Sequence, residues 1–102
     1  ILTTGFPRCF DFSDAPLSET MRRLSRYKKV RMIGCAGLAL AWTAGGMMDL
    51  YREENIFLWD VAAGIALVEA AGGHAAFTPI DGQWRTTVTA GSPSLVATEH
   101  AC

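Results

Sequence analysis

The chain has 102 residues, half of them hydrophobic, and a formal net charge of −1. This length predicts one domain, and the nearly neutral charge argues against nucleic acid or a membrane surface as a partner. No apolar run reaches the roughly 18 residues of a membrane helix, because Asp60 and Glu69 interrupt the longest one. The mean hydropathy of +0.20 is high for a small soluble domain, and it indicates a piece that buries one face against another domain.

The first half of the chain alternates between strand and helix patterns. In chain order we expect a strand over residues 1–4, a loop over 7–17, an amphipathic helix over about 18–28, a strand over 30–33 and a helix over 35–43. Ser18 is a suitable N-cap for the amphipathic helix, in which apolar residues recur at helical spacing. The helix after Gly34 is apolar nearly all round, which is typical of a buried helix.

The second half continues this alternation. We expect a strand over 47–52, a loop or strand end over 53–58, a buried helix over about 59–71, strands over 74–78 and 86–90 around a turn at 81–82, and a short last helix from Pro93. Strands that alternate with helices predict an α/β fold, with a layered mixed β-sheet flanked by helices.

The cysteines and histidines are few and scattered. Cys9, Cys35 and Cys102 are an odd number of thiols at wide spacing, and neither His74 nor His100 forms a zinc-site pattern with them. Unpaired thiols fit a reducing compartment better than a secreted disulfide framework. We therefore predict a cytoplasmic protein without a zinc site.

The segment around Asp60 is the most informative part of the chain. Between Phe57 and Gly73 the only ionisable groups are Asp60 and Glu69. A charge at the edge of so apolar an element needs a compensating cation, helix terminus or hydrogen bond. A helix that begins at Trp59 or Asp60 would place the carboxylate at the positive end of its dipole, facing a cleft. Two interpretations stay open from the residues alone: Asp60 only caps the helix, or it also binds a metal.

Three motifs stand in order along the chain. They are Val-Arg-Met-Ile-Gly-Cys-Ala-Gly at 30–37, Ala-Gly-Gly-Met-Met-Asp-Leu-Tyr at 44–51, and Trp-Asp-Val-Ala-Ala-Gly at 59–64 with Gly72 and Gly73 after it. In these motifs the chain resembles the inositol monophosphatase-like metal-dependent phosphatases, over about residues 1–96. One departure lies at Ala70, where that family has the Glu of a Glu-Ala-Gly-Gly sequence, while the acid here is Glu69.

The resemblance implies that residues 1–102 form the C-terminal α/β domain of this fold and that the N-terminal metal-binding half is absent. Asp60 would be one ligand of Mg²⁺, in a ligand set that this chain leaves incomplete. The family's other ligands stand in a Glu-containing helix and an Asp-Pro-x-Asp-Gly-Thr loop. Residues 79–82 nearly copy that loop, but we interpret their Pro, Asp and Gly as a turn. The chain opens at Ile1 without a start Met or signal-peptide pattern, which we interpret as a truncated or processed product.

The resemblance also implies a substrate pocket. Glu53 would accept hydrogen bonds from the hydroxyls of a sugar-like ring, although a shift of one residue would give this role to Glu54. The turn made of Gly34, Cys35 and Ala36 would offer backbone N–H groups to the substrate. The family prefers Ser or Thr where Cys35 stands. A catalytic thiol is not expected, and no residue of this chain is assigned a catalytic role.

A cluster of basic residues lies between positions 22 and 31. It holds six of the nine basic residues, namely Arg22, Arg23, Arg26, Lys28, Lys29 and Arg31. A nucleic-acid-binding patch would be interleaved with aromatic side chains, and only Tyr27 lies within the cluster. We interpret the cluster as the solvated outer face of an amphipathic helix.

Our first hypothesis for function is the C-terminal part of a Mg²⁺-dependent phosphomonoesterase that hydrolyses a small phosphorylated polyol such as inositol monophosphate. Its partners would be this substrate, the missing N-terminal half and, as in many relatives, a second copy of itself. The alternative is a non-catalytic binding or assembly module, a degenerate or fragmentary member of the same family. We expect the isolated chain to be inactive, because a single carboxylate holds Mg²⁺ only weakly.

Overall fold

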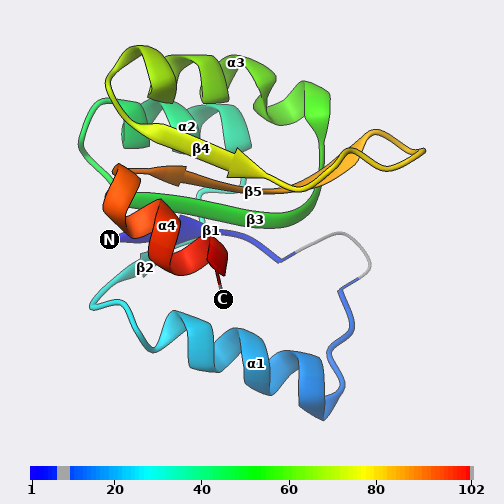
Figure 1. Ribbon diagram of the computed structural model, residues 1–102. Coiled ribbons are helices and arrows are strands. Elements are labelled where there is room, and N and C mark those ends of the chain that lie inside the picture. The colour runs from blue at the N-terminus through cyan, green and yellow to red at the C-terminus, as the bar shows by residue number, and fades with distance from the viewer. Residues whose placement is uncertain (7–9, 102) are drawn as a thin grey trace.

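The computed structural model describes residues 1–6 and 10–101, and in them it shows a five-stranded β-sheet with four helices (Figure 1). The strands are β1 (Leu2–Thr4), β2 (Val30–Arg31), β3 (Leu50–Phe57), β4 (His74–Phe77) and β5 (Arg85–Gly91). The helices are α1 (Asp14–Leu24), α2 (Ala36–Ala44), α3 (Leu58–Ala70) and α4 (Pro93–Ala101). The start of the predicted loop, residues 7–9, lies outside the described residues. The predicted α/β fold is confirmed.

The sheet is mixed, with the strand order β2-β1-β3-β5-β4. β1 is parallel to both β2 and β3, whereas β5 is antiparallel to both β3 and β4. Helices α2 and α3 cover one face of the sheet, and α1 and α4 lie on the other (Figure 1). The sheet therefore separates two layers of helices.

Each face of the sheet has its own hydrophobic core, because neighbouring side chains of a strand point to opposite faces. Tyr51 of β3 belongs to the larger core, with Leu40 of α2 and Val61 of α3. Leu50, the residue before it, belongs to the smaller core on the other face, with Val96 of α4. β3 thus carries side chains into both layers, and the candidate site lies along this strand.

α1 begins and ends four residues earlier than predicted. Ser13 stands at its N-cap position instead of Ser18, and the Ser13 carbonyl accepts the Leu17 N–H at 3.1 Å. Pro16 is only the third helical residue, and in the first turn a missing N–H removes no intrahelical hydrogen bond. The predicted loop is therefore wrong from Asp14 onward.

β3 is longer than predicted and contains a β-bulge. The sequence predicts a strand over 47–52 and a loop or strand end over 53–58, whereas the strand begins at Leu50 and its pairing with β5 continues to Phe57. The register shifts between Glu53 and Ile56, and Asn55 within this interval has a φ of 55°. One extra residue in β3 interrupts the alternation of side chains, so the sequence pattern did not show the second part of the strand. Glu53 consequently stands on a strand and not in a loop.

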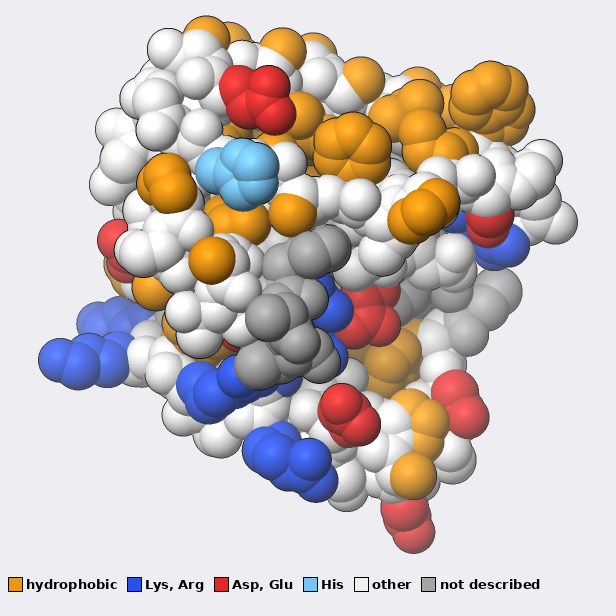
Figure 2. All heavy atoms as spheres, in the orientation of Figure 1, with side chains coloured by type: hydrophobic (Ala, Val, Ile, Leu, Met, Phe, Trp, Pro, Cys, Tyr) orange, Lys and Arg blue, Asp and Glu red, His pale blue; other side chains and the backbone are white. Residues whose placement is uncertain are grey.

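The apolar sequences of α2 and α3 predict helices that are buried on all sides, but both helices are exposed on one side. The buried residues of α3 form one stripe, from Val61 to Val68. The opposite side leaves Trp59 64% and Leu67 51% exposed, and Leu38 of α2 is 42% exposed. Figure 2 shows hydrophobic side chains gathered on the α3 side of the molecule. A helix that is apolar all round is buried when a further layer covers it, and the described residues form no such layer over α2 and α3.

α2 and α3 pack against each other at very short range. A Cβ atom on Gly64 of α3 would lie 2.5 Å from the Cβ of Leu40 of α2, which is closer than such atoms approach. Only glycine allows this contact, and the two helices lie on the sheet as one layer. Within the described part of the chain, none of the helices is long and apolar enough to cross a membrane.

Candidate active site

A pocket of about 340 Å³ lies beside β3, where α2 and α3 begin. Three separate stretches of sequence line it, namely the turn at 34–37, residues 53–57 of β3, and Asp60, together with Phe6 after β1. The structure therefore brings to one pocket every residue that the sequence assigned to the metal or the substrate. Both helices present their N-terminal, positive ends at this place.

The turn before α2 forms one wall of the pocket. Gly34 has a φ of +80°, a conformation that favours glycine. Cys35 stands at the N-cap position in an extended conformation, and its carbonyl accepts the Ala39 N–H at 3.0 Å. The first N–H groups of α2 thus lie at the pocket without intrahelical partners. The Cys35 side chain is an exposed free thiol, whereas Cys9 and Cys102 lie outside the described residues.

Asp60 is the third residue of α3, and it is exposed at the pocket. Phe57 stands at the N-cap position, so the helix has no side-chain cap there. The N–H of Leu58 donates instead to the Trp84 carbonyl at 2.8 Å. Asp60 therefore occupies the position of a first-turn acid beside the helix dipole rather than that of an N-cap.

Glu53 and Glu54 lie in different surroundings, although they are adjacent in sequence. The Glu54 carboxylate accepts hydrogen bonds from Arg23 at 2.8 Å and from Arg52 at 3.3 Å. The Glu53 carboxylate lies against Gly5 instead, where an added Cβ would be only 3.1 Å from Glu53 Oε1. Arginines therefore bind the Glu54 carboxylate, whereas the Glu53 carboxylate is available to the pocket.

Glu53 and Tyr51 influence each other's protonation. Burial raises the pKa of the Glu53 carboxyl, the Tyr51 hydroxyl opposes this rise, and the charge of Asp60 adds to it. Burial likewise raises the pKa of the Tyr51 phenol, and Glu53 raises it further. Glu53, Asp60 and Tyr51 therefore belong to one electrostatic environment.

Aromatic side chains that the sequence analysis missed complete the wall. Phe57 stacks on Trp59, with ring centroids 4.6 Å apart and planes at 8°. Phe6 contacts Phe10 and Phe12, with centroid distances of 4.9 and 5.3 Å. Phe6 and Phe57 both line the pocket. Phe57 and Trp59 are close to Asp60 in sequence, so the sequence could have predicted that they lie near the site. The place of Phe6 depends on the pairing of β1 with β3.

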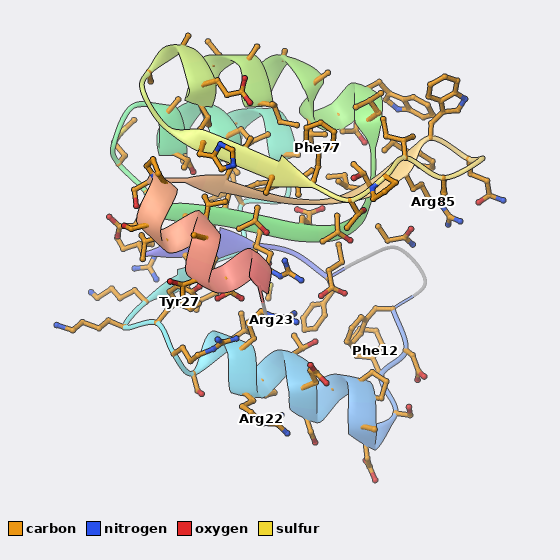
Figure 3. All side chains as sticks on the ribbon, in the orientation of Figure 1. Phe12, Arg22, Arg23, Tyr27, Phe77 and Arg85 are labelled. Carbon is orange, nitrogen blue, oxygen red and sulfur yellow. The ribbon has the colours of Figure 1, made fainter. Side chains whose placement is uncertain are left out.

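Buried charges occupy the opposite face of the sheet. Glu99 of α4 is 3% exposed, and it forms ion pairs with Arg23 at 3.2 Å and Arg26 at 3.6 Å. The Tyr27 hydroxyl donates a hydrogen bond to Glu99 at 2.5 Å. Figure 3 shows Arg23 and Tyr27 between α1 and α4, whereas Arg22 points away from the sheet. The prediction that the basic cluster faces solvent is therefore wrong for Arg23.

Asp81, within the near-copy of the metal loop, has the contacts of a turn residue. Its carboxylate accepts hydrogen bonds from the Arg85 N–H at 2.9 Å and the Gln83 N–H at 2.8 Å. The backbone hydrogen bond from Arg85 is the main reason that the pKa of Asp81 lies below its usual range. Among the described side chains, those of residues 1–6 and 10–99, no three His, Cys, Asp or Glu groups gather in a way that could hold a metal ion.

Comparison with known proteins identifies the family. The sequence profile described as the inositol monophosphatase family matches residues 6–101. The chain belongs to this family. An inositol-1-monophosphatase of Caulobacter vibrioides is 38% identical over 86 residues, which cover 79% of this chain and 31% of that protein. The Nus factor SuhB of Xylella fastidiosa is 43% identical over 75 residues, which cover 72% of this chain and 27% of that protein.

The fold agrees with this membership. The solved structure of the inositol monophosphatase from Anabaena matches with a TM-score of 0.71 and 33% identity, over 98% of this chain and 42% of that one. The mixed sheet and its flanking helices are thus those of the inositol monophosphatase family. The chain spans less than a third of the Caulobacter and Xylella relatives and less than half of the Anabaena protein.

Proposed function

We propose that residues 1–102 are the C-terminal domain of a Mg²⁺-dependent phosphomonoesterase, and that the whole protein hydrolyses a small phosphorylated polyol such as inositol monophosphate. The observation that carries this proposal is the pocket that collects Asp60, Glu53 and the turn at Gly34. The name of the Caulobacter relative supports the same activity. The exposed free thiol of Cys35 fits a reducing compartment such as the cytoplasm.

Asp60 would hold the metal. Its carboxylate offers the hard oxygen that Mg²⁺ prefers, and it stands exposed at the pocket on the first turn of a helix. One carboxylate fits one position of the Mg²⁺ shell, so the other protein ligands would come from the rest of the protein. When bound, the metal would polarise the phosphate and activate a water for in-line attack.

Glu53 and the turn would bind the organic part of the substrate. A carboxylate accepts hydrogen bonds from two neighbouring hydroxyls at once, which suits a polyol ring. Glu54 is a poor candidate for this role, because its carboxylate already accepts hydrogen bonds from Arg23 and Arg52. The free N–H groups at the start of α2 would donate to substrate oxygens.

The rest of the protein would cover the outer surface of α2 and α3. Leu38, Trp59 and Leu67 are exposed there, and contiguous apolar surface marks interaction sites. Asp60 lies at the end of the same layer, so a domain bound on this surface would reach the pocket with further ligands. We also propose a homodimer for the whole protein, and sedimentation of that protein tests it.

The test is a phosphatase panel on the protein at its natural length, with and without Mg²⁺. Asp60→Asn keeps the shape of the side chain and removes its charge, so kcat should fall by about 100-fold or more. Glu69→Gln is the matched control, because this exposed acid lies at the other end of α3. Activity of the Asp60 variant near that of the wild type at saturating Mg²⁺ would contradict the metal assignment.

The 102-residue chain alone should release no phosphate above background in the same panel, because its metal ligands are incomplete. Mixing it with the separately expressed remainder should restore activity. Turnover by the isolated chain would show that the metal site does not need ligands from the rest of the protein. Absence of activity from the whole protein with every substrate would favour the non-catalytic alternative.

A further inference from the structure

Tyr51 has a buried hydroxyl to which the proposed function assigns no role. It lies on β3 two residues before Glu53, so both side chains are on the face of the sheet that α2 and α3 cover. The residue is 0% exposed, and its hydroxyl has no hydrogen-bond partner within the described part of the chain. A buried hydroxyl without a partner is rare and costly, so this position calls for a partner nearby.

The groups around this hydroxyl belong to the pocket. Burial is the main cause that raises its pKa, and the charges of Glu53, Asp60 and Cys35 raise it further. The phenol therefore keeps its proton and can donate it to a hydrogen bond. Tyr51 in turn is the neighbour that lowers the pKa of the Glu53 carboxyl, as a donor to the ionised form does.

Gly5, directly after β1, bounds the Glu53 carboxylate from the side of the neighbouring strand. Thr4 of β1 pairs with Arg52 of β3, so Gly5 follows at the level of Glu53. An added Cβ on Gly5 would lie 3.1 Å from Oε1 and 3.4 Å from the Cδ of Glu53. Any other residue at position 5 would therefore reduce the space around the Glu53 carboxylate.

We propose that Tyr51 and Gly5 are positioning residues for Glu53: the Tyr51 hydroxyl donates to the Glu53 carboxylate, and the bare backbone of Gly5 leaves the space in which that carboxylate meets the substrate. The inference rests on the proposed role of Glu53 as the acceptor for substrate hydroxyls. With one oxygen held by Tyr51, the other oxygen has a fixed direction toward the pocket. Tyr51 and Gly5 would therefore set selectivity for a hydroxyl at one position of the ring.

The first test needs no activity. Crystal structures of the whole protein are compared for the wild type, Tyr51→Phe and Gly5→Ala. We expect Tyr51 Oη within about 3.2 Å of a Glu53 carboxylate oxygen in the wild type, and a displaced carboxylate in both variants. Tyr51→Phe keeps the ring that fills the core, so it decides the matter if Gly5→Ala does not fold. A Glu53 carboxylate in the same place in the wild type and Tyr51→Phe would overturn the inference.

The second test is a double-mutant cycle on the whole protein. Tyr51→Phe should raise KM for the polyol phosphate about five- to tenfold and change kcat by less than about twofold. In a Glu53→Gln background the same substitution should change KM by less than about twofold, because Tyr51 acts through Glu53. Tyr27→Phe is the matched control: it removes a hydroxyl bonded to Glu99, away from the pocket, and should leave KM unchanged.

The outcomes separate the two proposals. Independent, multiplicative effects of Tyr51→Phe and Glu53→Gln on KM would overturn the positioning role and leave the phosphatase proposal standing. A wild-type protein without activity on any substrate would overturn the phosphatase proposal. In that case the position of the Glu53 carboxylate in the three structures still decides the inference.

Discussion

The two helical layers stabilise the same sheet by different chemistry. On one side, the buried Glu99 of α4 pairs with Arg23 of α1 and with Arg26 just after that helix, and β3 contributes Arg52 at 4.0 Å. On the other side, Gly64 of α3 packs on Leu40 of α2, and the outer surface is apolar and exposed. A layer whose charges pair with one another is complete as it stands, whereas an exposed apolar layer gains stability when it is covered. The pocket opens at the end of the incomplete layer, which is where a second domain would contribute to it.

The largest expected effect breaks the charged layer. Glu99→Gln should lower the free energy of unfolding by about 3 kcal/mol, because it removes the buried carboxylate that Arg23, Arg26 and Arg52 surround. Urea denaturation measures the change. Arg23→Gln should also destabilise the fold, while the adjacent Arg22→Gln should have almost no effect, since Arg22 points away from the sheet (Figure 3). Equal effects of the Arg22 and Arg23 substitutions would show that the ion pairs of Glu99 do not stabilise this layer.

The next effect breaks the apolar layer. Gly64→Ala should lower the free energy of unfolding by about 2 kcal/mol, because the new methyl group overlaps Leu40 and forces α2 and α3 apart. Gly37→Ala in α2 is the matched control. An added Cβ there meets nothing within 4 Å, so the better helix propensity of alanine should stabilise the protein by about 0.5–1 kcal/mol. Stabilisation by both substitutions would contradict the close packing of the two helices.

A third prediction sharpens the contrast between covered and exposed surfaces. The 102-residue chain should self-associate through α2 and α3, and Leu38→Gln with Leu67→Gln should reduce this association in sedimentation experiments. Met21→Gln is the control, because this exposed apolar residue lies on α1 in the charged layer. In the whole protein the same double substitution should be destabilising, since it places polar groups in the proposed interface. If the double substitution leaves self-association unchanged, the chain associates through another surface.

The smallest effect concerns the β4–β5 turn, outside both layers. The lowered pKa of Asp81 means that its charge stabilises the fold above the ordinary value of about 4, and that this contribution is lost as pH falls through the lower folded-state value. Asp81→Asn should therefore lower Tm by about 1–2 °C at neutral pH. The difference from the wild type should disappear in thermal melts at about pH 2. A difference that persists there would mean that the charge is not the cause.

Local patterns predicted the elements that depend on local chemistry. The sequence placed the α3 helix at 59–71, and the structure has it at Leu58–Ala70. The start of α1 was missed, because Ser13 and Ser18 are equally good caps and Pro16 is read as a helix breaker unless the first turn is known. The exposure of α3 was missed for another reason. An apolar helix sequence indicates a buried surface, but it does not show which part of a protein buries it.

Long-range contacts account for the remaining errors. Tyr27 and Glu99 are 72 residues apart in sequence, and no periodicity relates them. Family motifs, and not residue chemistry alone, selected Asp60, Glu53 and the Gly34 turn, while the structure placed them at one pocket. The choice between Glu53 and Glu54 needed the pairing of β3, because only the sheet shows which acid meets the arginines. The binding of metal and substrate by these residues stays a prediction.

The bulge at Asn55 also marks a place where the length of the chain can change. Glu53 lies at the pocket, and Ile56 packs against the core on the same face, although an unbroken strand would send residues three apart to opposite faces. The extra residue thus resets the phase of the strand before α3 begins. Deleting Asn55 would leave Glu53 and Ile56 two residues apart, as in a regular strand, so both would keep their face and only the bulge would be lost. A deletion in the first turn of α3 would instead turn Asp60 by about 100° around the helix axis and away from Glu53, so the chain between these two acids should tolerate the loss of a residue at the bulge better than at the helix start.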